Sequence, residues 1–167
     1  SSGDISAVTT APRSILGGLT WNLSVINDQL TAGRDDGLYK INNYRASAVS
    51  QATGYWTCRP IPQTSPLKIV AGNYLGIHFY EFDKGNFIDK GVVEKFTESG
   101  RYVETEENNI WVSHPYRGIY KINSDGTAVT LFTQKDGLPA DLDNHVFKIK
   151  NKIVFATSAG VYEYEAT

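Results

Sequence analysis

A glycine-centred segment that occurs four times limits the folds open to this 167-residue chain more than any other feature. Each copy consists of a short apolar run, a polar turn, a glycine, and a second run in which apolar and polar residues alternate. The copies span residues 30–41, 69–80, 110–122 and 153–164, and their glycines, Gly37, Gly76, Gly118 and Gly160, are 39, 42 and 42 residues apart. A repeat of about 40–45 residues made only of strands is typical of a β-propeller blade. The sequence therefore predicts an all-β fold of four propeller blades.

Each blade should be a sheet of four antiparallel strands that run from the inner to the outer edge. We predict inner strands at residues 22–26, 56–61, 101–107 and 145–149, and second strands at residues 29–32, 67–71, 110–113 and 152–157. Third strands are predicted at residues 37–41, 76–82, 119–123 and 160–165. Outer strands are predicted at residues 46–50, from about residue 87, and at residues 129–133. The fourth repeat thus has three strands.

The repeats predict one partial β-propeller domain over residues 1–167, with units at about 20–53, 54–98, 99–143 and 144–167. Residues 4–10 are rich in β-forming residues and are predicted as the outer strand of a preceding blade. Two arrangements explain this strand: a ring of four blades that it closes, or a piece of a larger propeller. We favour the piece, which would expose strand edges to the rest of the propeller or to a second copy.

Composition excludes several functional classes. A formal net charge of −2, from 16 basic and 18 acidic residues without a basic cluster, argues against nucleic-acid binding. A single cysteine, Cys58, excludes an internal disulfide and a thiolate metal site. His78, His114 and His145 lack metal-ligand spacing, so neither a metal nor another cofactor is expected. No apolar run approaches the roughly 18 residues of a membrane span, so this segment should make no direct membrane contact.

The most regular repeat resembles a known family. The segment Ile110-Trp-Val, followed by Gly118-Ile-Tyr-Lys-Ile122, is similar to the repeat of two-component regulator propellers, and so is the linker Phe132-Thr-Gln-Lys-Asp-Gly-Leu-Pro139. The likeness covers most of residues 20–165 and is strongest over residues 101–165. The second repeat departs from it with His78-Phe-Tyr80, and the first lacks the tryptophan of the second strand. The resemblance implies part of the periplasmic sensor region of a bacterial hybrid two-component system or a membrane-anchored transcription regulator.

Candidate binding residues follow from the propeller geometry. Loops between second and third strands, and loops between blades, gather on one face around the central channel, and the latter include residues 98–101 and 135–145. Aromatic rings on that face can stack on sugar C–H groups while polar groups bind hydroxyls. The candidate ligand-binding residues are Arg34, Asp35, Asp36, Trp56, Tyr74, His114, Tyr116 and Arg117.

Three functions remain open at this point. The preferred one is a non-catalytic sensor segment in signal transduction that recognises a small molecule or oligosaccharide, or a partner module. The second is a propeller enzyme of lyase, lactonase or glycosidase type. This chain offers it no catalytic residues, because the adjacent Asp35 and Asp36 would seldom point at one substrate atom and no other motif completes a site. The third is an interaction scaffold without a small ligand.

Overall fold

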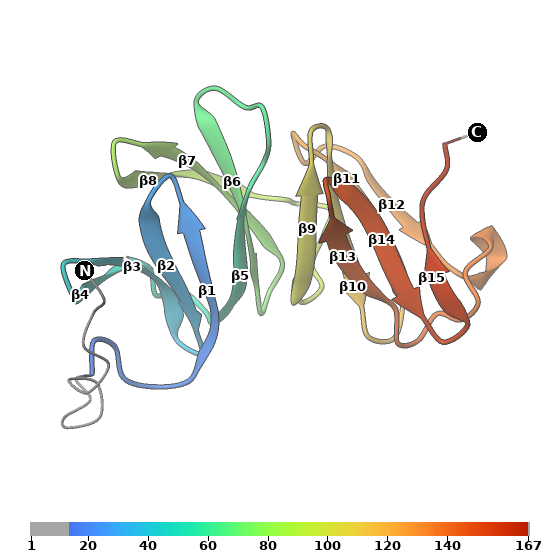
Figure 1. The fold of residues 1–167 in the computed structure, drawn as a ribbon, viewed down its shortest axis with the longest axis horizontal. Coiled ribbons are helices and arrows are strands. Elements are labelled where there is room, and N and C mark those ends of the chain that lie inside the picture. Colours follow the sequence, from blue (N-terminus) through green and yellow to red (C-terminus); the bar gives the residue numbers. More distant parts are fainter. Residues whose placement is uncertain (1–13, 167) are drawn as a thin grey trace, which may run out of the picture.

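A computed structural model describes residues 14–166, and its strands form four antiparallel sheets that follow one another in chain order (Figure 1). The first sheet contains β1 (Thr20–Ile26), β2 (Gln29–Arg34), β3 (Gly37–Asn42) and β4 (Arg45–Ser50). The second contains β5 (Tyr55–Pro60), β6 (Leu67–Asn73), β7 (Ile77–Asp83) and β8 (Asn86–Val92). The third contains β9 (Tyr102–Glu106), β10 (Asn109–His114), β11 (Gly118–Asn123) and β12 (Val129–Phe132). The fourth contains β13 (His145–Ile149), β14 (Lys152–Thr157) and β15 (Gly160–Tyr162).

The sheets are the blades of a β-propeller, which confirms the predicted fold class. Each inner strand contacts the inner strand of the next blade: β1 contacts β5, β5 contacts β9, and β9 contacts β13. The strands predicted within residues 14–166 all form, although β15 ends earlier than residue 165. A short 3₁₀ helix, η1 (Gln134–Asp136), which the repeat does not predict, lies in the link between the last two blades. The strand predicted at residues 4–10 lies outside the described residues.

Each junction between consecutive blades has its own hydrophobic core. Ile26 and Leu38 of the first blade pack with Cys58 and Tyr80 of the second. A larger cluster joins the second blade to the third, and a third cluster joins the third blade to the fourth around Trp111. One cluster per junction is what radial stacking of sheets requires, because adjacent sheets bury the faces that they turn toward each other.

Glycine on the second strand lets the next blade come close. A Cβ atom on Gly72 of β6 would overlap the carbonyl oxygen of Gly100, just before β9. At the last junction the equivalent residue is Ser113, whose hydroxyl instead accepts a hydrogen bond from the backbone N–H of Val146 at 3.0 Å. The repeated glycine after the turn has a different role in the last two blades, where Gly118 has φ +110° and Gly160 has φ +136°, values that residues with a side chain rarely adopt. Gly37 and Gly76 lack a positive φ, and a Cβ atom there would instead overlap the carbonyl oxygens of Ser50 and Phe96.

One face of the first blade is uncovered in the part of the chain that the structure describes. Leu23 is 61% exposed on β1, whereas its register equivalents Cys58 and Val103 are 2% exposed because the preceding blade covers them. The expected contact of strand edges with the rest of a propeller or with a second copy stays a prediction. Separately, no helix of residues 14–166 has the length and hydrophobicity needed to cross a membrane.

The buried thiol of Cys58 should make the fold sensitive to alkali. Loss of solvent raises its pKa from 9.0 to about 12, and burial also raises the pKa of the neighbouring Tyr80 hydroxyl. A pKa that is higher in the folded state stabilises the fold below the unfolded pKa and loses that contribution as the pH rises toward the folded one. We expect the free energy of unfolding to fall above about pH 9 because of Cys58, and above about pH 10 because of Tyr80 as well, by about 1.4 kcal/mol per pH unit for each group.

Urea unfolding at a series of pH values measures this effect. Cys58→Ala should flatten the decline by about one proton, leaving the contribution of Tyr80. In the unaltered protein near neutral pH, a thiol reagent should label Cys58 only at the rate of unfolding. Rapid labelling of the native protein, or equal stability at about pH 8 and about pH 10.5, would contradict the burial of this thiol.

Candidate functional site

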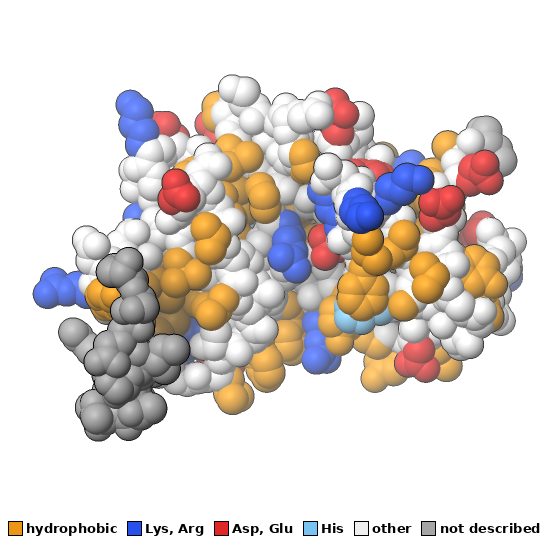
Figure 2. All heavy atoms as spheres, viewed as in Figure 1, with side chains coloured by type: hydrophobic (Ala, Val, Ile, Leu, Met, Phe, Trp, Pro, Cys, Tyr) orange, Lys and Arg blue, Asp and Glu red, His pale blue; other side chains and the backbone are white. Residues whose placement is uncertain are grey.

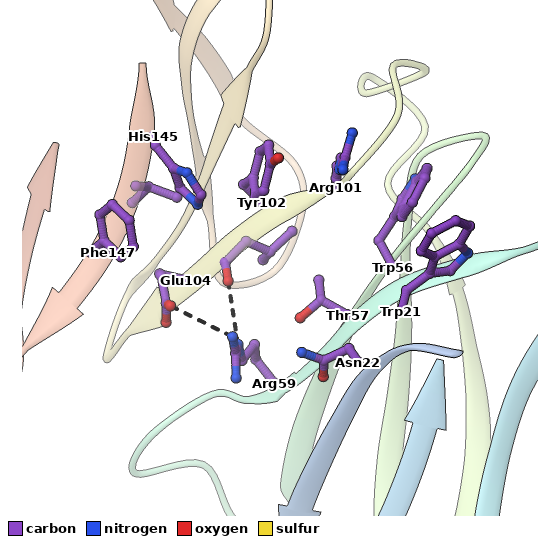
Figure 3. Close-up of a pocket in the computed structure, with 12 residues that line it drawn as sticks. Trp21, Asn22, Trp56, Thr57, Arg59, Arg101, Tyr102, Glu104, His145 and Phe147 are labelled. Carbon is purple, nitrogen blue, oxygen red and sulfur yellow. Dashed lines mark hydrogen bonds and ion pairs between the residues drawn. The ribbon is translucent and has the colours of Figure 1, made fainter. Parts of the chain in front are cut away.

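The first residues of the four inner strands surround a pocket of about 290 Å³ at the centre of the propeller (Figure 3). Every blade contributes to it, because the inner strands β1, β5, β9 and β13 all face the same central space. Figure 2 shows charged side chains in the hollow between the first two and the last two blades, with hydrophobic side chains on both sides. The lining residues are Trp21, Asn22, Trp56, Thr57, Arg59, Arg101, Tyr102, Val103, Glu104, His145, Val146 and Phe147.

One wall of the pocket is a row of three aromatic rings. The ring centroids of Trp21 and Trp56 are 5.0 Å apart, and those of Trp56 and Tyr74 are 4.7 Å apart. The Trp21 indole N–H donates a hydrogen bond to the Tyr74 hydroxyl at 2.8 Å. Both tryptophans occupy β-bulges at the start of their strands, where the pairing register with the second strand shifts. A bulge redirects its side chain, which here sends two rings to the same wall.

The opposite wall comes from the last two blades. The His145 ring lies 4.0 Å from the Tyr102 ring centroid and stacks on Phe147 at 4.3 Å (Figure 3). Partial burial, and then the nearby charge of Arg101, lower the pKa of His145 below 6.5. This imidazole is therefore neutral at pH 7 and acts as a third flat ring in the wall.

Two arginines and one glutamate supply the charge. The Arg101 guanidinium lies over the Trp56 ring, 4.8 Å from its centroid, and 5.2 Å from the centroid of Tyr102. Deeper in the pocket, Arg59 pairs with Glu104 at 3.7 Å and donates a hydrogen bond from Nε to the Val103 carbonyl at 3.5 Å. Burial raises the pKa of the Glu104 carboxyl, while Arg59 and then Lys148 oppose that rise.

A buried hydroxyl completes the polar part of the lining. Thr57 is 4% exposed, and its Oγ1 atom has no hydrogen-bond partner among the described residues. Buried hydroxyls are normally hydrogen-bonded, and an unpaired one costs about 1–3 kcal/mol. Because Thr57 lines the pocket, a polar group of a ligand can supply the missing partner.

One of the predicted site residues lines this pocket, and a second supports it from behind. Trp56 lines it, and Tyr74 stacks behind Trp56. Arg34, Asp35 and Asp36 lie elsewhere and pair with one another: Arg34 is 3.8 Å from Asp35 and 3.3 Å from Asp36, its guanidinium lies over the Tyr39 ring, and its Nε atom has no hydrogen-bond partner among the described residues. These contacts hold the loop between β2 and β3 together, so this trio has a structural explanation.

The remaining predicted residues form another cluster. The Glu98 carboxylate lies 3.4 Å from His114 Nε2 and 3.1 Å from Arg117 Nε. His114 is buried, and its Nδ1 atom accepts a hydrogen bond from the Tyr116 backbone N–H. The Tyr116 side chain is 74% exposed. The structure therefore does not bring this loop into the central pocket.

Most residues of the pocket were not predicted, because the candidate binding residues were placed in loops and not at the starts of the inner strands. Trp21 and Trp56 occupy equivalent positions at the starts of consecutive inner strands, and this equivalence was a signal available in the sequence. Arg101 and His145 lie at the ends of loops that were expected on this face, but nothing local marks them as binding residues.

The arrangement is suited to binding a small polar molecule with flat or C–H-rich faces. Aromatic walls supply dispersion contacts, and Thr57, Asn22 and the arginines supply hydrogen bonds. Glu104 is the only acidic residue in the lining, and it is paired with Arg59. Within residues 14–166, no group of three or more His, Cys, Asp or Glu side chains is placed to hold a metal ion.

Comparison with known proteins finds similarity in structure alone. No protein-family model matches the chain, and no curated protein matches it in sequence. The fold is similar to the extracellular domain of BT4673 from B. thetaiotaomicron, named as a one-component system in one structure and as a hybrid two-component system in another. The identities are 18% in both, over 90% of this chain, with TM-scores of 0.70 and 0.68.

The extracellular domain of BT3049, a hybrid two-component system of the same organism, is similar at 16% identity over 95% of this chain, with a TM-score of 0.68. This chain spans 21% of the BT4673 chains and 24% of the BT3049 chain. At these identities the likeness establishes the propeller fold.

Proposed function

We propose that the chain is a non-catalytic sensor segment of a bacterial signal-transduction regulator, on the extracytoplasmic side of the membrane. Its propeller fold is shared with extracellular domains of two sensor systems from B. thetaiotaomicron. Its role is to bind a small ligand in the central pocket, and the ligand class that fits best is an oligosaccharide.

The observation that carries this proposal is the facing pair of aromatic walls with polar groups between them. Trp21 is 42% exposed and Phe147 is 42% exposed, so each wall presents a ring to the pocket and to solvent. Aromatic rings stack on the C–H faces of sugars, and fixed donors and acceptors distinguish their hydroxyls. An apolar metabolite would leave the unpaired Thr57 hydroxyl without a hydrogen-bond partner.

The enzyme alternative finds little support in the lining. Glycosidases use two carboxyl groups on opposite sides of the scissile bond, and Glu104 is the only carboxyl group lining this pocket. A hydrolase reading would also require Glu104 to act as an acid while it is paired with Arg59. The scaffold alternative does not account for an unsatisfied hydroxyl and exposed rings around one pocket.

Calorimetric titration of the chain with a panel of neutral and acidic oligosaccharides tests the proposal. We expect saturable binding of at least one saccharide, and we expect Trp56→Ala to weaken it at least tenfold, equal to about 1.4 kcal/mol. Tyr44→Ala is the matched control, because Tyr44 is a 71% exposed aromatic residue in the β3–β4 turn, at the outer edge of the first blade. If no saccharide binds, or if both variants bind equally well, the proposed sensor pocket is wrong.

A further inference from the structure

We propose that the saccharide taken by this pocket carries an anionic oxygen group, a carboxylate or a sulfate ester, and that Arg101 binds that group. This inference rests on the function proposed above and specifies its ligand class.

The charges of the pocket lining sum to a positive value. Arg59 and Arg101 face one acidic residue, Glu104, and the remaining lining residues are aromatic, apolar or neutral polar groups. Lys148 adds a further positive charge beside the pocket, since its Nζ donates a hydrogen bond to the carbonyl of Thr105. The whole chain has a formal net charge of −2, so the positive balance is local to the pocket.

The two arginines of the lining differ in the hydrogen bonds and ion pairs that they already form. Arg59 is committed to Glu104 and to the Val103 carbonyl. Within residues 14–166, the Arg101 side chain makes no ion pair or hydrogen bond, and its guanidinium lies over the rings of Trp56 and Tyr102. Stacking on rings fixes the plane of a guanidinium and leaves its N–H groups to point outward.

A planar guanidinium held in this way matches an anionic oxygen group. Its N–H donors can form two parallel hydrogen bonds to a carboxylate or to a sulfate, and these charge-assisted bonds are roughly twice as strong as neutral ones. The Trp56 indole N–H does not compete for the anion, because it donates to Ser99 Oγ at 2.9 Å. Arg101 is therefore the residue in the lining best placed to bind a negative charge.

The position of Glu104 determines the orientation in which an anionic ligand binds in the pocket. Figure 3 shows Arg101 at one end of the pocket and the Glu104–Arg59 pair at the other. A ligand anion beside Glu104 would be repelled, whereas the same anion at Arg101 is attracted. The hydroxyls of the sugar then face Thr57 and Asn22, which line the end near Arg59.

The test compares an anionic saccharide with its neutral ester and adds a sulfated sugar as the second kind of anion. The full chain is titrated by calorimetry with tri-galacturonate, with its fully methyl-esterified form, and with a sulfated galactose disaccharide. We expect tri-galacturonate or the sulfated sugar to bind at least tenfold more tightly than the ester, and we expect the difference to shrink as salt is raised. Which of the two anions binds more tightly identifies the carboxylate or the sulfate as the preferred group.

Variants assign the effect to Arg101. Arg101→Gln should reduce binding of the anionic saccharide at least tenfold and leave binding of the methyl ester unchanged. Arg45→Gln is the control, because it makes the same change of charge on the exposed outer strand β4. It should alter neither the binding of the anionic saccharide nor the binding of the methyl ester. Circular dichroism and thermal unfolding of both variants exclude a loss of folding as the cause.

The outcomes separate this inference from the proposed function. If the methyl ester binds as tightly as tri-galacturonate, or if Arg101→Gln weakens both ligands equally, the anionic ligand class is overturned while the saccharide pocket stands. If none of the three sugars binds and no other saccharide of the panel binds, the proposed function and this inference fail together.

Discussion

Replacing Gly72 by alanine is expected to lower the free energy of unfolding by about 2–3 kcal/mol, or the melting temperature by about 6–10 °C. The added Cβ would overlap the Gly100 carbonyl oxygen and would also contact a methyl group of Val103 at 3.0 Å. Both neighbours belong to the entry of the third blade, and one of them is backbone. The second and third blades must therefore move apart, which disturbs the largest hydrophobic cluster of the chain. Thermal unfolding followed by circular dichroism measures the change.

Gly17→Ala is the control for this substitution. Nothing lies within 4 Å of the Cβ that would be added there, so its melting temperature should match that of the unaltered chain. If Gly72→Ala also leaves the melting temperature unchanged, the blades do not approach one another as closely as the structure has them.

Trp111→Ala should be the most destabilising single substitution between the third and fourth blades, at about 3–5 kcal/mol. Trp111 is 1% exposed, and its ring packs 5.3 Å from Phe155 and 5.1 Å from Tyr164. Its indole N–H donates a hydrogen bond to the Glu106 carboxylate at 2.8 Å, which the variant leaves without that partner. The fourth blade then loses most of its packing, so urea unfolding should shift and proteolysis should begin after residue 132.

Trp21→Ala provides the contrast. Trp21 is 42% exposed, so its loss should cost less than about 1 kcal/mol of stability while weakening saccharide binding. A Trp111→Ala variant as stable as the Trp21→Ala variant would contradict the packing of the third blade against the fourth.

The fold was largely predictable because every repeat contains the same local sequence pattern. An apolar run, a turn, a glycine and an alternating run specify a hairpin in each copy, and spacings of 39 and 42 residues leave room for two more strands. Gly118 illustrates why this succeeds: a residue needed for its positive φ can be recognised from the sequence alone. The 3₁₀ helix at Gln134–Asp136 was not predicted, since it depends on a capping box formed by Thr133 and Asp136 within a linker.

The site was much less predictable because its residues meet only after the blades have stacked. Trp21, Trp56, Arg101 and His145 are far apart in sequence, and radial stacking alone brings them around one pocket. The bulges that redirect both tryptophans arise from pairing with the second strand, which a single sequence does not reveal. Loop residues such as Arg34 and Asp36 looked like ligand contacts, but in the structure they pair with each other.

The central claim, that equivalent positions in successive blades build one saccharide pocket, can be tested on the three tryptophans of the chain. Their indole N–H groups give separate signals in a two-dimensional ¹H–¹⁵N NMR spectrum. During titration with the tightest-binding saccharide of the panel, the signals of Trp21 and Trp56 should shift together and saturate, while that of the buried Trp111 stays in place. Signals of Trp21 and Trp56 that do not move while the saccharide binds, or a shift confined to Trp111, would contradict the account.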